Sequence, residues 1–215
     1  MQELVNVTAI VLSSIPVGEY DRRVVLLTKE RGKITAFAKG ARRQTSKLIA
    51  ATNLFAFGEF KLYPGRSSYT MTDAQIQNYF EELRIDFEGA YYGMFFLEVC
   101  DYYTRENNDE KEFLKLLYQS LKALLAKSLN RKLVQCIFEM KAMVINGEFP
   151  GMPTDELWQE STKYAVSYIM SSSIEKLYTF TVSDTVLEEM IRISERYRLR
   201  YIDREFKSLE MLAVL

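Results

Sequence analysis

The feature that most constrains the fold is a change in the spacing of apolar residues near residue 80. Before it, Val, Ile, Thr and aromatic residues gather in runs of strand length, at 5–13, 23–29, 33–40, 55–63 and 69–79. Turn residues separate these runs at Pro16-Val-Gly-Glu, Arg31-Gly32 and Pro64-Gly65. With a short helical segment expected at 46–52, they predict a five-stranded barrel of the OB type. An SH3-like barrel is the structural alternative.

Beyond residue 80, apolar residues recur every three or four positions, which indicates helices. Residues 83–103 are apolar on most sides, as in the central helix of a bundle. Further helices are expected to start at Asp109, Arg131, Thr154 and Ser183, and Gly147 is expected to end the second of these. The predicted fold class is therefore α+β, with an OB-type barrel over residues 1–80 followed by an all-α helical domain over 81–215.

Charge is distributed unevenly although the formal net charge is only −1. Residues 1–80 hold 11 Lys and Arg against 6 Asp and Glu, whereas residues 81–215 hold 17 against 23. No acid lies between Arg31 and Gly58, and KGARRQTSK at 39–47 carries four basic side chains. A block of one sign in a strand-to-helix connection favours contact with phosphates, with Gly40 allowing close backbone approach. Nearby aromatic residues could stack on bases or fill the barrel, namely Phe37, Tyr63 and Tyr69.

The composition argues against an enzyme. The chain has no histidine, so it lacks an imidazole base, a histidine-activated nucleophile and a histidine metal ligand. Its two cysteines, Cys100 and Cys136, lie in apolar helical patterns typical of small buried side chains, and two cannot form a four-cysteine zinc site. No P-loop or GxGxxG motif is present. We therefore expect no catalytic residues, no metal and no cofactor.

The sequence also bears on location. Residues 1–20 contain no Lys or Arg ahead of an apolar segment, and no later run is long enough to span a membrane. We expect a cytoplasmic, nucleoid-associated protein without a membrane partner.

Several motifs resemble the N-terminal signature of the bacterial RecO family. They are Gly18-Glu-Tyr-Asp-Arg, Leu27-Thr-Lys-Glu-Arg-Gly-Lys-Ile, Ala38-Lys-Gly-Ala-Arg-Arg and Gly58-Glu-Phe-Lys-Leu-Tyr, in the family's order and spacing. The resemblance is strong over residues 4–80 and looser through the helical part.

This resemblance implies a DNA repair and recombination mediator. RecO proteins bind single- and double-stranded DNA, anneal complementary strands and, with RecR and in many bacteria RecF, help RecA replace single-strand binding protein on DNA. They also bind the acidic, hydrophobic C-terminal tail of that protein, commonly through the helical domain. The sequence assigns no residue to the tail site; the basic and aromatic residues at 196–207 equally suit a packed surface helix.

Carried over by position, the family's basic barrel face comprises Arg22, Arg23, Lys33, Lys39, Arg42, Arg43 and Lys47. Arg22 ranks below the 39–47 group, because it could instead form a structural ion pair with Asp21 or another acid. The four-cysteine zinc site of many members is missing after Gly147. We expect packing around Phe149, Trp158 and Tyr164 to replace it.

Two hypotheses of other classes remain. A protein scaffold would use the basic barrel to contact an acidic protein and would have no affinity of its own for DNA. A nuclease that holds a metal through carboxylates would cleave DNA in the presence of divalent ions.

Overall fold

The computed structural model describes residues 3–215, which form two compact units. One unit contains the chain up to Arg84 together with Leu97–Leu114, and the other contains Ile85–Phe96 and Lys115–Leu215. The helix α3 (Phe87–Tyr103) therefore contributes to both units.

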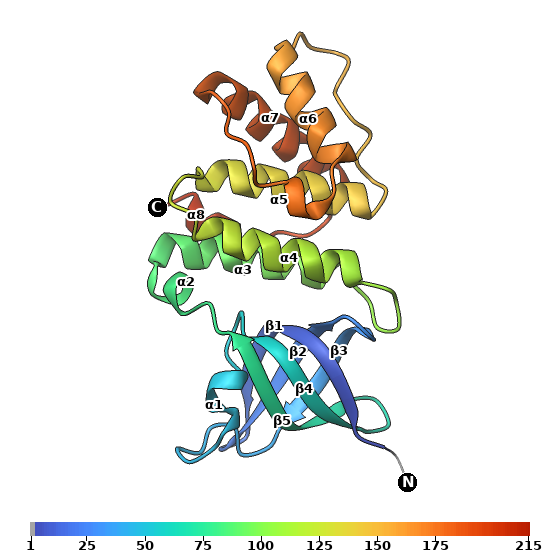
Figure 1. Cartoon of the computed structure of the whole chain (residues 1–215), viewed down its shortest axis with the longest axis vertical. Coiled ribbons are helices and arrows are strands. Elements are labelled where there is room, and N and C mark those ends of the chain that lie inside the picture. The colour runs from blue at the N-terminus through green and yellow to red at the C-terminus, as the bar shows by residue number, and fades with distance from the viewer. Residues whose placement is uncertain (1–2) are drawn as a thin grey trace. The chain divides into compact units, whose positions relative to one another are not determined.

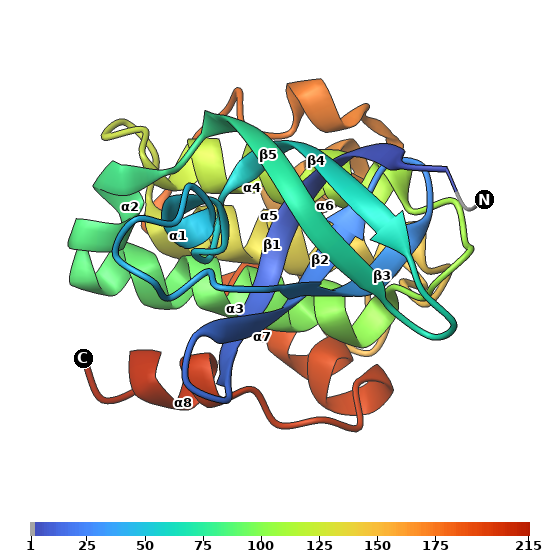
Figure 2. The ribbon, with the colours of Figure 1, turned by 90° about the horizontal axis from the view of Figure 1, so that it is seen from below.

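The first unit is built on a closed five-stranded barrel (Figure 1). Its strands are β1 (Val5–Val17), β2 (Asp21–Thr28), β3 (Gly32–Ala38), β4 (Phe57–Pro64) and β5 (Tyr69–Asn78), in the order β1-β2-β3-β5-β4. All neighbours are antiparallel except β3 and β5, and the short helix α1 (Leu48–Ala51) lies between β3 and β4 in the sequence. Figure 2 shows the strands wrapping around one another. This confirms the predicted OB-type barrel and the helical region that follows it.

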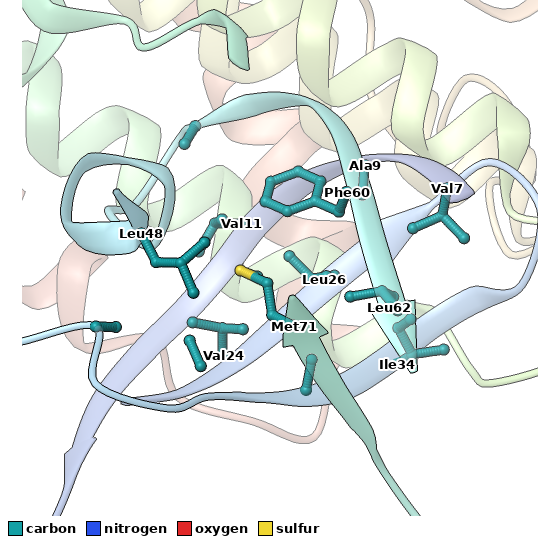
Figure 3. Close-up of a cluster of buried hydrophobic side chains, with 14 residues drawn as sticks. Val7, Ala9, Val11, Val24, Leu26, Ile34, Leu48, Phe60, Leu62 and Met71 are labelled. Atoms are coloured by element: carbon teal, nitrogen blue, oxygen red, sulfur yellow. The ribbon is translucent and has the colours of Figure 1, made fainter. Parts of the chain in front are cut away.

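The barrel interior is filled by alternate residues of each strand. Val24, Leu26, Ile34 and Ala36 are at most 1% exposed, and Phe60 lies fully buried among them (Figure 3). Met71 of β5, the strand between β3 and β4, belongs to the same cluster. Because neighbouring residues of a strand point to opposite faces, this core also decides which side chains face outward.

The predicted strand bounds agree with the structure to within a few residues, except in β1. Pro16 and Val17 were expected in a turn, but they extend β1 and pair with Arg22 and Asp21. The pairing of β1 with β4 ends at Ile10, so Pro16 lies where β1 has lost one neighbour. Proline is tolerated at such an edge because no partner strand needs its missing N–H.

The turn between β2 and β3 is held by the segment that follows α3. Lys33 N donates to Arg105 O at 3.0 Å, and Asn107 N donates to Arg31 O at 3.0 Å. Gly32 has φ +65°, and a Cβ placed there would lie 2.2 Å from Arg105 O. This turn therefore requires glycine both for its backbone conformation and for the close approach of the segment.

The remaining elements are helical: α2 (Glu81–Ile85), α4 (Lys111–Leu124), α5 (Arg131–Ile145), α6 (Glu160–Ser171), η1 (Ile174–Lys176), α7 (Asp184–Tyr201) and α8 (Lys207–Leu212). The expected starts of α4, α5 and α7 are confirmed to within two residues. The single helix expected over 83–103 is wrong, because Asp86 separates α2 from α3 and its carboxylate accepts from Gly89 N at 3.0 Å. The start expected at Thr154 is also wrong, since α6 begins at Glu160.

The loop 147–159 is pinned to α7. Arg196 makes a bidentate contact to Asp155 at 2.9 and 2.7 Å, and Tyr197 donates to Gly151 O at 2.9 Å. Phe149 and Trp158 are buried, which confirms their expected packing role. Tyr164 was expected to join them but is 74% exposed. Asp155, which was expected near the start of a helix, instead anchors this loop to α7 through Arg196.

A buried lysine caps the C-terminus of α6. Lys141 is 8% exposed, and its ammonium donates to the carbonyl oxygens of Ile169, Met170 and Ser172 at 3.2, 3.2 and 2.8 Å. The last carbonyls of a helix have no partner within the helix and carry partial negative charge, so a buried cation satisfies both needs.

Cys100 and Cys136 are buried and unpaired with each other, as expected for small apolar side chains. Burial raises the pKa of both thiols, which keeps them protonated and unreactive at neutral pH. Within residues 3–215, no helix has the length and apolar character needed to cross a membrane.

Replacing Gly32 by alanine should destabilise the protein more than the same change at Gly18. Gly18 also has a positive φ, +57°, but no atom lies within 4 Å of a Cβ placed there. Gly18→Ala should therefore lose about 1 kcal/mol from backbone strain alone, and Gly32→Ala at least about 1 kcal/mol more, because the Arg105 carbonyl must move. Chemical denaturation measures both; equal losses would contradict the close approach.

Candidate nucleic-acid interface

A row of outward-facing residues crosses the barrel. The strand register places Arg23 of β2 opposite Phe37 of β3, Phe37 opposite Thr70 of β5, and Thr70 opposite Tyr63 of β4. Arg23 is exposed, Tyr63 is 45% exposed and Phe37 is partly exposed. The row thus brings a cation and two aromatic rings from separate parts of the sequence onto one face.

Tyr69 does not belong to this row. It lies opposite Ala36, whose side chain is buried, and its ring packs against the barrel core. Of the three aromatic candidates, Phe37 and Tyr63 are therefore available for stacking on bases. Tyr69 instead packs against the barrel core, which was the other role considered for these rings.

The loop 39–47 is docked on the turn between β1 and β2. Gly40 N donates to Asp21 Oδ1 at 2.7 Å, and Arg42 N donates to Tyr20 O at 2.8 Å. Ala41, between them, is fully buried. The cations of this loop therefore rise from a backbone that is held in place.

Within the protein, Gly40 is required for its backbone conformation and not for close packing. Its φ is +66°, and the nearest atom to a Cβ placed there belongs to the Arg43 side chain at 3.6 Å. A side chain would fit in space but would strain the backbone.

Two guanidinium groups lie over the β1–β2 turn. Arg42 donates through Nη1 to Gly18 O at 3.2 Å, and the Arg43 guanidinium lies 4.9 Å from the centre of the Tyr20 ring. Both arginines remain exposed, as does Lys39. Tyr20 is 42% exposed and was missed by sequence reasoning; an aromatic residue beside a turn glycine was the available signal.

Lys47 is set apart from this group by an ion pair. Its ammonium lies 2.8 Å from Asp73 Oδ1, and Lys61 lies 3.9 Å from the other oxygen of that carboxylate. The hydrogen bond from Lys47 lowers the pKa of Asp73, which therefore stays ionised. To contact a phosphate, Lys47 must break its ion pair with Asp73 or contact both groups at once.

Arg22 and Lys33 are engaged in contacts within the protein. The Arg22 guanidinium donates to Ser14 Oγ, Thr52 O and Asn53 Oδ1 at 3.2–3.3 Å; the alternative ion pair with Asp21 is not what holds it. Lys33 has a side chain 22% exposed and lies 3.0 Å from Asp101 Oδ1. The structure thus places Arg23 opposite Phe37 and Arg43 over Tyr20, and it leaves Lys39 and Arg42 exposed in the same loop as Arg43. Arg22 and Lys33 are held in structural contacts.

Exposed cations beside aromatic faces can hold phosphates while bases stack. Across residues 3–215, no group of three His, Cys, Asp or Glu is arranged to hold a metal ion. The exposed cations and aromatic rings are suited to binding a polyanion.

The helical unit contains a separate pocket of about 280 Å³ between α5, α7 and α8. Ile191, Leu209 and Leu212 form apolar parts of its wall. Its charged lining consists of two cations, Lys132 and Arg198, and two acids, Glu139 and Glu195. Arg198 lies 3.6 Å from both Glu139 and Glu195. Lys132 is exposed and forms no ion pair with any residue in the described range 3–215.

Comparison with known proteins agrees with this architecture. The family model for the N-terminal part of recombination protein O matches residues 1–80, and the model for its C-terminal part matches residues 84–152. Proteins named DNA repair protein RecO are similar over nearly the whole chain. That of Acetivibrio thermocellus is 26% identical, covering 97% of this chain and 96% of its own; that of Alkaliphilus metalliredigens is 26% identical, covering 97% and 98%. Together the two models cover well over half of the sequence, and the chain belongs to the recombination protein O (RecO) family of DNA repair proteins.

Proposed function

We propose that this protein is a recombination mediator that binds single- and double-stranded DNA on the outer face of its barrel and anneals complementary strands. With RecR it would help RecA replace single-strand binding protein on DNA, with RecF as a further partner in organisms that use it. It would act in the cytoplasm, at the nucleoid.

Two observations carry the proposal: Arg23 lies in the aromatic row, and Arg42 and Arg43 lie exposed over the β1–β2 turn. Arg42 and Arg43 emerge from a backbone tied to the β1–β2 turn, so little ordering is needed when they meet phosphates. Arg23 lies directly opposite Phe37, which allows one strand to be held by its phosphates and by a stacked base together. None of these contacts reads base identity, as annealing of any sequence requires.

Annealing in this proposal needs no covalent step, and the protein is not an enzyme. Lysine and arginine on the barrel neutralise phosphates, which lowers the repulsion between two strands and raises their local concentration. All seven basic residues of the predicted face remain candidates. We rank Arg42, Arg43, Lys39 and Arg23 first, then Lys47, and last Lys33 and Arg22, whose side chains already have partners.

The double variant Arg42→Ala/Arg43→Ala should bind a fluorescent single-stranded oligonucleotide more weakly than wild type, with a flatter dependence on salt. Each lost phosphate contact lowers the slope of log K against log salt by roughly 0.7, so the pair should lower it by about 1.4. Fluorescence anisotropy over a salt series measures the slope.

The matched control is Lys122→Ala/Lys127→Ala, which removes the same charge from exposed positions of the helical unit. It should leave the slope unchanged. Equal slopes for the barrel variant and wild type would move the DNA site elsewhere, and no wild-type binding at low salt would favour a protein scaffold. DNA recovered after incubation with Mg²⁺ should be full length; cut product would favour a nuclease.

We propose in addition that the pocket between α5, α7 and α8 takes the C-terminal tail of single-strand binding protein. Its walls combine apolar side chains with Lys132, which suits a chain end that is both hydrophobic and negatively charged. Because Arg198 already has two acidic neighbours, Lys132 is the cation best placed to meet the terminal carboxylate.

Lys132→Ala should weaken binding of a labelled tail peptide by up to about fivefold, the effect expected for a solvent-exposed ion pair. Amidation of the peptide's C-terminus should weaken wild-type binding similarly and cause little further loss in the variant, since both changes remove one contact. Lys127→Ala is the control. Independent, additive losses would contradict the assignment of Lys132 to the carboxylate.

A further inference from the structure

The turn between β1 and β2 carries three exposed apolar side chains. Ile15 is 46% exposed, Val17 is 37% exposed and Tyr20 is 42% exposed. Ile15 lies opposite Arg23 and Val17 lies opposite Asp21, so both point to the outer face, as Arg23 and Phe37 do. We call Ile15, Val17 and Tyr20 the hairpin tip.

Cations surround this tip. Arg42 donates to the backbone of Gly18, Arg43 lies over the Tyr20 ring, and Arg23 is the cross-strand neighbour of Ile15. The segments 15–23 and 39–43 hold five basic residues against two acids, Glu19 and Asp21. The Asp21 carboxylate accepts a hydrogen bond from Gly40 N, which ties it to the loop 39–47.

An apolar tip surrounded by guanidinium groups fits a partner that presents apolar area directly beside dense negative charge. Nucleic acid does so where base faces are exposed. Along a duplex, the base faces are stacked and closed to a protein, but the last base pair before a single strand begins has one open face. Aliphatic side chains are the kind that proteins insert against unstacked base steps.

We propose that the hairpin tip packs against the terminal base pair at a junction of double- and single-stranded DNA. The single strand would continue from the tip along Arg23, Phe37 and Tyr63. This inference rests on the proposed DNA binding and adds its preferred substrate, a tailed or gapped duplex.

The test compares three labelled DNAs of equal strand length: a single strand, a blunt duplex and a duplex with a single-stranded tail. Wild type should bind the tailed duplex more tightly than either of the others. Ile15→Thr/Val17→Thr, which keeps the β-branched shape suited to a strand, should lose about tenfold on the tailed duplex, as expected for two aliphatic side chains that are partly buried on binding. It should bind the single strand as wild type does.

A second measurement uses the fluorescent base 2-aminopurine, placed in the terminal base pair. Its emission should change when wild type binds and should not change with the threonine variant. The matched control is Leu157→Ser/Leu199→Ser, which removes two exposed apolar side chains from the helical unit and should keep both the preference and the emission change. Denaturation midpoints check that each variant is folded.

The outcomes separate this inference from the proposed function. Tight, salt-dependent binding of single strands with no preference for the tailed duplex would overturn the junction site and leave the barrel interface standing. Absence of DNA binding would overturn both. An anionic lipid surface shares the chemistry of an apolar tip among cations. Binding to vesicles of phosphatidylcholine and phosphatidylserine that depends on the tip, without a junction preference, would assign the tip to membranes and overturn the proposal.

Discussion

The barrel and its outer face depend on one short contact, the parallel pairing of β3 with β5. Only Ala36 with Tyr69 and Phe37 with Thr70 are paired there, yet this contact closes the sheet. Because side chains alternate along a strand, the register that buries Ala36 in the core turns Phe37 outward. Closure therefore produces the core and, on the opposite face, a row in which Arg23, Phe37 and Tyr63 are neighbours.

The charged loop presents exposed cations from a backbone that is held in place. Ala41 is buried, and the N–H groups of Gly40 and Arg42 on either side of it donate hydrogen bonds to the β1–β2 turn. The side chains of Arg42 and Arg43 therefore project from a backbone that is held in place. Their guanidinium groups rest on a carbonyl and an aromatic ring, and neither forms an ion pair with a carboxylate of residues 3–215. Lys47 and Lys33 differ because each faces an acid, Asp73 and Asp101 respectively.

Sequence reasoning predicted the barrel, most strand bounds and the charged loop, because strand periodicity and turn residues are local signals. It could not separate Tyr69 from Phe37 and Tyr63, since the inward or outward direction of a ring depends on the register with a distant strand. It placed a helix start at Thr154 because acids commonly begin helices, but Asp155 is bound by Arg196, a partner 41 residues away. The single helix expected over 83–103 was wrong because Asp86 prefers to cap α3. Residues distant in the sequence thus determine the direction of the Tyr69 ring and the structure around Asp155, whereas a local cap at Asp86 determines where α3 begins.

The central claim is that DNA lies on the outer row of the barrel. It is tested most directly by ultraviolet cross-linking of the protein to a bromodeoxyuridine-containing single strand, followed by mass spectrometry of the adducts. Bases stacked on aromatic rings react with those rings, so the adducts should fall on Phe37 or Tyr63. Adducts confined to residues 115–215, with none on the barrel, would contradict the account.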